Sequence, residues 1–176
     1  MISAIIEPTG GGGRLVATFA SLTSAAADGL VREVIVVDPT GSAETAVLAD
    51  EAGATRVGST ADALASARQP WLLVLRAGTR LESGWAQAAW RHIERGGRQA
   101  GWFQLSYRGA WPRAPFEEAS AALAARFGRL RAEHGLLAPR GMLDRTAPRQ
   151  SGSTLPARLK RGALRPVGAR ILAELA

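Results

Sequence analysis

Polar residues follow three apolar stretches of the chain, and their side chains could bind a ligand. The three segments are Glu7-Pro8-Thr9, Asp38-Pro39-Thr40 and Arg76-Ala77-Gly78-Thr79. Each apolar stretch is typical of a buried strand, and ligands of open α/β sheets bind beyond the carboxyl ends of the strands. The carboxylate of Asp38 can accept hydrogen bonds from a base or a ribose, although Asp before Pro is also typical of a simple turn. The three segments together predict a ligand site at one edge of a sheet.

A run of glycines, Gly10–Gly13, precedes Arg14 where a helix is expected to begin. Backbone N–H groups at the start of a helix can hold a phosphate. The run lacks the Lys-Ser/Thr of a Walker loop and the spacing of a dinucleotide fingerprint. A flexible turn explains it as well, because glycine adopts many backbone conformations.

Apolar runs and helical periodicity alternate along most of the chain. Strands are predicted at residues 2–6, 33–37, 54–57, 71–75, 101–107 and 136–138, and helices at 15–30, 43–52, 61–68, 83–95 (capped by Ser83) and 116–133. The segments 155–164 and 167–175 are predicted as short pieces of helix or strand. This alternation indicates βαβ units, and therefore a single α/β domain with a mainly parallel sheet flanked by helices.

The composition is that of a globular protein, with 47% apolar and 21% charged residues in a chain of 176. The chain has no cysteine, which excludes disulfides and cysteine-ligated metals. No apolar run approaches the ~20 residues of a membrane-spanning helix, and the N-terminus lacks the pattern of a signal peptide. A cytoplasmic location is therefore expected.

The net charge of +7 is concentrated near the C-terminus, where residues 137–176 carry eight basic and two acidic residues. We therefore predict a domain over 1–145 and a basic segment over 146–176 that packs on it or extends from it. Such a segment attracts phosphates, or it is an ordinary solvated basic surface. Nucleic acid is not an expected partner, because zinc-finger spacing, an RNP-type aromatic motif and a clear recognition helix are missing from the sequence.

The order of these segments resembles the family 2 glycosyltransferases, which have the GT-A fold. Those enzymes open with a strand that ends in Ile-Pro-x-x-Asn/Glu, and here the chain has Ile5-Ile6-Glu7-Pro8-Thr9-Gly10. They continue with a strand such as Glu-Val-Ile-Val-Val-Asp-Asp-Gly-Ser, and here it is Glu33-Val-Ile-Val-Val-Asp-Pro-Thr-Gly-Ser42. One bacterial branch then has Trp-Leu-Leu-Phe-Leu-His-Ala-Asp-Thr-Arg-Leu-Pro-x-Gly-Trp, similar to Trp71-Leu-Leu-Val-Leu-Arg-Ala-Gly-Thr-Arg-Leu-Glu-Ser-Gly-Trp85. The likeness covers residues 1–107 and continues weakly to 140.

This resemblance implies that a nucleotide-diphosphate sugar binds across the carboxyl edge of the sheet. Asp38 would contact the base, and Pro8 and Thr9 would line the nucleoside pocket. A divalent metal normally bridges the diphosphate to an aspartate in the third segment. Gly78 stands in its place and offers no side-chain oxygen, so a divalent metal is not expected. Arg76 could neutralise the diphosphate instead.

The acids that would drive sugar transfer also differ from the family pattern. Pro39 replaces the second acid of the Asp-Asp pair, and residues 150–155 have no acid where the family carries its general base. An inverting transfer needs a base near the acceptor hydroxyl. The nearest candidates are Glu133 and His134, which are also typical of a helix end capped by Gly135.

Three functional hypotheses follow from the residues and the resemblance. The first is a glycosyltransferase-like protein that binds a nucleotide-diphosphate sugar, with impaired transfer favoured over active transfer. The second is a non-catalytic relative that regulates or binds a partner chain, or forms a homodimer. The third is a nucleotidyltransferase-like protein, because those enzymes also begin with a strand and a glycine-rich loop that ends in arginine.

Overall fold

The computed structural model describes residues 1–8, 12–95, 99–107, 118–120, 122–124, 134–143 and 164–173. The elements are β1 (Ile2–Glu7), α1 (Gly12–Ala27), β2 (Val31–Val37), α2 (Ala43–Glu51), β3 (Thr55–Val57), α3 (Thr60–Ser66), β4 (Trp71–Arg76), β5 (Arg80–Leu81), α4 (Trp85–Glu94), β6 (Ala100–Tyr107), β7 (Leu136–Pro139), α6 (Arg140–Leu143) and β8 (Leu164–Ala173). Residues 118–120 and 122–124 are also helical.

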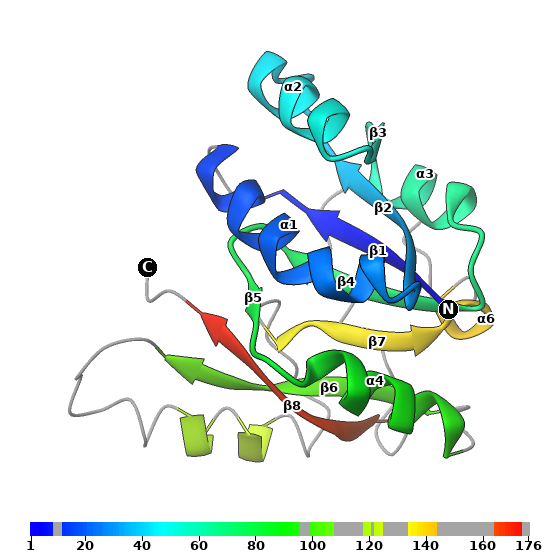
Figure 1. Cartoon of the computed structure of the whole chain (residues 1–176), viewed down its shortest axis with the longest axis vertical. Helices are drawn as coiled ribbons and strands as arrows, with labels where there is room; N and C mark the ends of the chain where they lie inside the picture. Colours follow the sequence, from blue (N-terminus) through cyan, green and yellow to red (C-terminus); the bar gives the residue numbers. More distant parts are fainter. Residues whose placement is uncertain are drawn as a thin grey trace.

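The strands form one sheet in the order β3-β2-β1-β4-β7-β6-β8-β5 (Figure 1). The first four of these are mutually parallel, as the alternation of strands and helices predicts. β7 is antiparallel to both β4 and β6, β8 is parallel to β6, and β5 is antiparallel to β8. The α/β class with a sheet flanked by helices is therefore confirmed, and the second half of the sheet is mixed.

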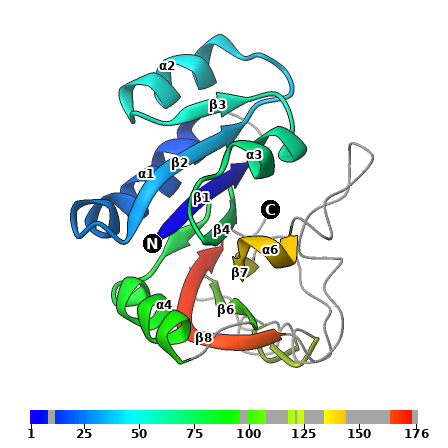
Figure 2. The ribbon, with the colours of Figure 1, turned by 90° about the vertical axis from the view of Figure 1, so that its right-hand side faces the viewer.

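Helices cover both faces of this sheet (Figure 2). On one face, α1 and α4 pack on alternate strand residues such as Ile6, Leu73 and Leu75, and we call this the α1 face. On the other face, α3 and α6 pack on Ile5 and the residues that alternate with the first set, and we call this the α3 face. Burial on both faces explains why the central strands are almost continuously apolar in sequence.

Two element predictions need correction in detail. The helix predicted from residue 83 begins at Trp85, and the residue before it is Gly84, with φ +84° and no side-chain cap. The Ser83 cap is therefore wrong, because the left-handed Gly84 places the serine outside the helix. Of the C-terminal segments predicted as helix or strand, the described residues 164–173 form the strand β8, which lies between β6 and β5. Residues 144–163 and most of the helix predicted at 116–133 lie outside the described residues.

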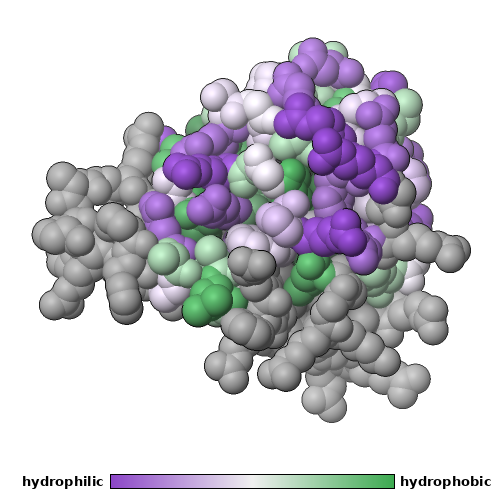
Figure 3. All heavy atoms as spheres, turned by 90° about the horizontal axis from the view of Figure 1, so that it is seen from below, coloured by the Kyte–Doolittle hydropathy of each residue, from purple (hydrophilic) through white to green (hydrophobic). Residues whose placement is uncertain are grey.

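One face of the molecule is mostly polar among the described residues. Seen from below, charged and polar side chains cover most of the coloured surface, and hydrophobic groups are small and separate (Figure 3). Among the described residues, no helix combines the length and apolar character needed to cross a lipid bilayer.

Candidate functional site

The three polar segments meet at one edge of the sheet, which we call the carboxyl edge. Ile6 of β1 is in register with Val36 of β2 and with Leu75 of β4. The three strands are parallel, so the residues that follow them, Pro8, Asp38 and Gly78, leave the sheet at the same end (Figure 1, left). Adjacent strands lie ~4.8 Å apart, which puts the ends of β2 and β4 within about 10 Å of each other. The structure therefore brings these predicted residues together, and Thr9 lies outside the described residues.

Asp38 is held by its own turn and by β3. One carboxylate oxygen accepts hydrogen bonds from the Thr40 N–H (3.1 Å), the Thr40 hydroxyl (2.8 Å) and the Gly41 N–H (3.1 Å). The other oxygen pairs with the Arg56 guanidinium at 3.3 Å. Asp38 is only 7% exposed, so these partners replace most of its water. The carboxylate organises this turn, and a base or ribose would have to share its acceptor positions.

Burial alone would raise the pKa of Asp38, but the hydrogen bonds from Thr40, Arg56 and Gly41 outweigh it and hold this pKa below its ordinary value of 3.8. A lowered carboxyl pKa stabilises the fold above the unfolded value, and this stabilisation is lost as the pH falls through the folded value. We therefore expect urea unfolding of the wild type to show a free energy that declines as the pH falls below about 3.8.

Asp38→Asn should lose the part of this decline that belongs to Asp38. It should also lower the free energy of unfolding at pH 7 by about 1–3 kcal/mol, because the amide cannot replace a carboxylate that accepts four hydrogen bonds. Equal pH slopes in both proteins below about pH 5 would show that Asp38 is not the responsible group.

Gly78 has a structural reason to be glycine. The chain from Arg76 to Thr79 makes a tight turn in which the Thr79 N–H donates to the Arg76 carbonyl at 3.0 Å. Gly78 is the third residue of this turn and has φ +95°, a conformation that side-chain-bearing residues rarely adopt. Its N–H donates to the Arg14 carbonyl at 2.9 Å and to the Thr18 hydroxyl at 3.0 Å. The turn is therefore attached to the first turns of α1.

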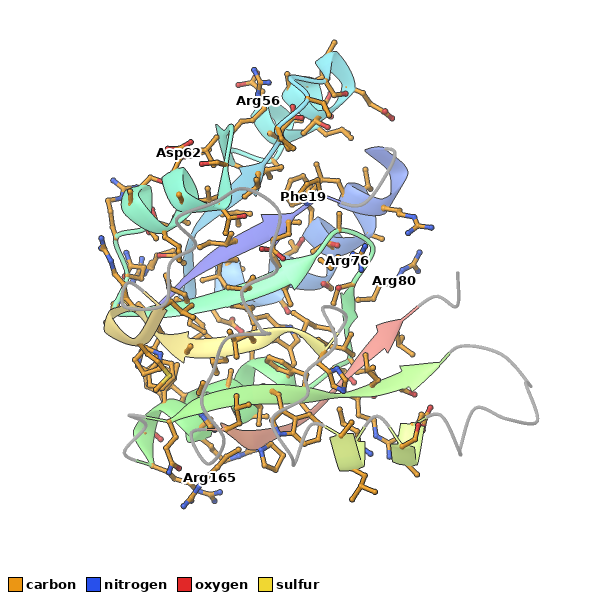
Figure 4. All side chains as sticks on the ribbon, turned by 180° about the vertical axis from the view of Figure 1, so that it is seen from behind. Phe19, Arg56, Asp62, Arg76, Arg80 and Arg165 are labelled. Atoms are coloured by element: carbon orange, nitrogen blue, oxygen red, sulfur yellow. The ribbon has the colours of Figure 1, made fainter. Side chains whose placement is uncertain are left out.

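Two further arginines accompany Arg76 at this turn. Arg80 follows it in β5, and Figure 4 shows Arg76 and Arg80 near each other at the carboxyl edge. Arg14 approaches from α1, because a Cβ added to Gly78 would meet the aliphatic part of the Arg14 side chain at 3.6 Å. The sequence pattern assigns Arg76 to the diphosphate and links Arg14 only to the glycine run. Arg80 has no sequence signal beyond its position directly after the turn.

Glu7 is an acid at the carboxyl edge; it belongs to the first polar segment, but the sequence assigns it no separate role. It ends β1, is 9% exposed, and is in register with Arg76 of β4. Residues in register on adjacent strands point to the same face, which for this pair is the α3 face. A buried acid at the end of an otherwise apolar strand was the available signal. At this edge the Glu7 carboxylate therefore lies on the strand next to that of the Arg76 guanidinium.

His134 lies just before β7, near the same edge of the sheet, but it is fully buried. It lies two residues before Leu136, which pairs with Val74 in the antiparallel ladder between β7 and β4. Its ring stands edge-on to Trp102, with ring centroids 5.7 Å apart. A ring in this position could accept a proton from an acceptor hydroxyl only if its neighbours moved. Glu133, the other predicted base, lies outside the described residues.

The start of α1 already faces a carboxylate. Gly12 is the first residue of the helix, and a Cβ there would collide with the carboxylate of Glu44 and with Leu48 from α2. A carboxylate beside a helix N-terminus already compensates the partial positive charge of the helix dipole, which would otherwise favour a bound phosphate. Of the glycine run, Gly10 and Gly11 lie outside the described residues.

A groove of about 730 Å³ on the α1 face is lined in part by Arg80. Its walls come from α1, from the segment around β5 and from the end of β8, and include Val16, Ala17, Arg80, Leu81 and Leu172. Arg80 therefore borders both the groove and the turn. Asp38 and Pro8 do not line it.

The described residues do not suit a divalent metal at this edge. They contain no group of three or more His, Asp or Glu side chains that could share an ion. Gly78 has no side-chain oxygen, and the oxygens of Asp38 are already engaged. Hard cations need several oxygen ligands, whereas guanidinium groups supply positive charge directly.

The sequence matches no protein-family model, and no curated protein is significantly similar to it. Solved structures, in contrast, are similar in fold. A mannosyltransferase from Pyrobaculum calidifontis, in complex with GDP-Man and Mn²⁺, is 14% identical with a TM-score of 0.66 over 97% of this chain and 56% of that one. TarS from S. aureus is 14% identical with a TM-score of 0.68, over 99% of this chain and 37% of that chain.

Glucosyl-3-phosphoglycerate synthase from Mycobacterium tuberculosis, in complex with Mn²⁺, UDP and glucosyl-3-phosphoglycerate, is 18% identical with a TM-score of 0.57. The match covers 98% of this chain and 70% of that one. This chain thus spans about half the length of the mannosyltransferase and a smaller part of TarS. At these identities the similarity establishes the fold alone. The chain has the GT-A fold found in glycosyltransferases.

Proposed function

We propose that this protein binds a nucleotide-diphosphate sugar at the carboxyl edge of its sheet. The observation that carries the proposal is the meeting of Pro8, Asp38 and the Arg76–Thr79 turn at one edge of a GT-A fold. Two of the similar structures hold a guanosine or uridine diphosphate compound. In this chain Asp38 would face the nucleoside, and Arg76 would neutralise the diphosphate.

The proposal includes impaired sugar transfer. An inverting transfer needs a carboxylate or imidazole that reaches the acceptor hydroxyl. Asp38 is occupied by its turn, His134 is buried against Trp102, and Glu7 lies beside Arg76 on the α3 face. The protein is therefore proposed to hold its ligand more effectively than it turns it over, as a divergent relative of the family 2 glycosyltransferases.

The remaining parts of the proposal concern organisation and location. Residues 1–145 would supply the donor site. Residues 146–176 would contribute basic charge as well as the strand β8, which lies within them. The proposed location is the cytoplasm. The proposed ligands there are UDP-sugars or GDP-sugars.

Titration calorimetry with UDP and GDP tests the proposal directly. We expect the wild type to bind at least one of them, and Arg76→Ala to weaken this binding by about ten- to hundredfold, because a charged hydrogen bond to phosphate contributes about 1.5–3 kcal/mol. Arg165→Ala is the matched control, since Arg165 is an exposed arginine at the opposite end of the sheet (Figure 4).

The outcomes separate binding from catalysis. Binding that is lost in Arg76→Ala and kept in Arg165→Ala supports the proposed site. No binding of either nucleotide by the wild type would overturn it. Steady release of sugar from a UDP- or GDP-sugar by the wild type would keep the site and overturn the impaired transfer.

A further inference from the structure

The first turns of α1 and the turn from Arg76 to Thr79 are joined as one unit. The N–H of Gly78 donates to both the Arg14 carbonyl and the Thr18 hydroxyl, at 2.9 and 3.0 Å. Thr18 is fully buried, and its hydroxyl donates in turn to the Arg14 carbonyl at 3.4 Å. The backbone of Arg14 is therefore fixed relative to the end of β4.

The side chain of Arg14 is guided by the same contact. Its Cβ, Cγ and Cδ atoms lie 3.6 Å from the place where a Cβ of residue 78 would be. The aliphatic part of Arg14 thus passes over the glycine, in the direction that a side chain of residue 78 would take. Arg14 is exposed, so its charge is accessible to a ligand from solvent.

Three arginines therefore lie at this one turn, with the side chain of Arg76 on the α3 face and Arg14 and Arg80 on the α1 side. Arg76 begins it, Arg80 follows it, and Arg14 lies over its glycine. The helix N-terminus is not an equivalent source of positive charge, because the carboxylate of Glu44 lies against Gly12. Guanidinium groups remain charged at every accessible pH and bind phosphate oxygens in pairs.

We propose, on the basis of the proposed function, that Arg14 binds the diphosphate of the ligand and supplies there the positive charge that a divalent metal would otherwise provide. The glycine at residue 78 makes this possible. Its positive φ closes the turn, and the stem of Arg14 lies at van der Waals distance, 3.6 Å, from the place where a Cβ of residue 78 would stand. Ligand binding by this chain is therefore independent of divalent metal.

Calorimetric titration of UDP and GDP, each with excess EDTA and again with excess Mn²⁺, tests this proposal. The variant Arg14→Met keeps an aliphatic side chain over Gly78 and removes only the charge. Arg14→Lys restores a charge on a similar stem, and Arg165→Ala again removes an exposed arginine at the far end of the sheet. Thermal unfolding of each variant reports whether the fold is retained.

For the wild type we expect equal affinities in EDTA and in Mn²⁺. Arg14→Met should weaken binding by about ten- to hundredfold, Arg14→Lys by less, and Arg165→Ala should leave it unchanged. Binding that requires Mn²⁺, or that is unaffected in a folded Arg14→Met protein, overturns the role of Arg14 but leaves the proposed function standing. If the wild type binds neither nucleotide in either solution, the proposed function fails and this inference fails with it.

Discussion

Gly135→Ala is expected to destabilise the protein by about 2–5 kcal/mol, a large part of the ~5–15 kcal/mol that holds a domain folded. Gly135 has φ +61°, where a Cβ costs about 1–2 kcal/mol. The new Cβ would also lie 2.8 Å from Ile171, 3.0 Å from Leu75 and 3.4 Å from Phe103. All three neighbours are fully buried or nearly so, and overpacking of such a core adds about 1–3 kcal/mol.

Chemical denaturation monitored by circular dichroism measures this effect. Gly141→Ala is the matched control, because a Cβ at Gly141 meets nothing within 4 Å and its φ is not positive. That variant should change the free energy of unfolding by less than about 1 kcal/mol. Similar values for the two variants would mean that the start of β7 is packed more loosely than the structure shows.

Glu33→Ala should lower the free energy of unfolding by about 2–4 kcal/mol at neutral pH. One Glu33 oxygen accepts hydrogen bonds from the Ser3 hydroxyl (2.5 Å) and the Arg68 N–H (2.6 Å). The other accepts from the Arg68 guanidinium at 3.0 Å. Ser3 is fully buried, so removal of its acceptor leaves a desolvated hydroxyl in the sheet.

The pH dependence should identify Glu33 as the group involved. Burial by itself would raise the pKa of Glu33, but the hydrogen bonds from Ser3 and Arg68 and the charge of Arg68 hold it below its ordinary value of 4.5. Its stabilisation is therefore present above that value and lost as the pH falls, so wild type and variant should converge in acid. The exposed Glu51 at the end of α2 provides a control, Glu51→Ala, which should cost under about 0.5 kcal/mol. A constant difference at all pH values would rule out the carboxylate charge as the cause.

The two predictions concern opposite ends of the same strands. Hydrogen bonds of Ser3 with Glu33 and with the Gln69 N–H connect β1 to β2 and to the segment before β4. These contacts lie near the amino ends of the strands. Gly135 lies near the carboxyl edge, where β7 enters the sheet beside β4. Because both anchor the central strands, loss of either should also disturb the position of the Arg76–Thr79 turn. Ligand binding in these variants is therefore informative only at temperatures where each is folded.

Local patterns along the chain were sufficient for much of the first half of the fold. Runs such as Ile2–Ile6 and Trp71–Leu75 are apolar without interruption, because both faces of a central parallel strand are covered by helices. Turn residues after each run then marked the ends of β1, β2 and β4. Since parallel strands share a carboxyl edge, the meeting of Pro8, Asp38 and Gly78 could be predicted from the order of the elements.

The second half depended on contacts between residues distant in the sequence. The pattern at 136–138 predicted a strand, but nothing local showed that β7 would run antiparallel between β4 and β6, or that β8 would join β6 and β5. The pairing of a strand depends on partners that are distant in the sequence. The β-propensity of a segment indicates only that its residues fit a pleated surface. The prediction that Ser83 caps α4 is wrong for a related reason. The left-handed backbone at Gly84 determines where α4 begins, and the presence of a serine nearby does not.

At the carboxyl edge, the sequence by itself determined which residue types are present: an aspartate after β2, an arginine and a glycine after β4, and no acid at residues 39 or 78. The tertiary structure alone decided how they act together. It placed Arg14 over Gly78, set Glu7 beside Arg76 and buried His134 against Trp102. The physical reason is that charge and hydrogen-bonding capacity belong to a residue, whereas its partners and its exposure to water depend on which elements pack against it.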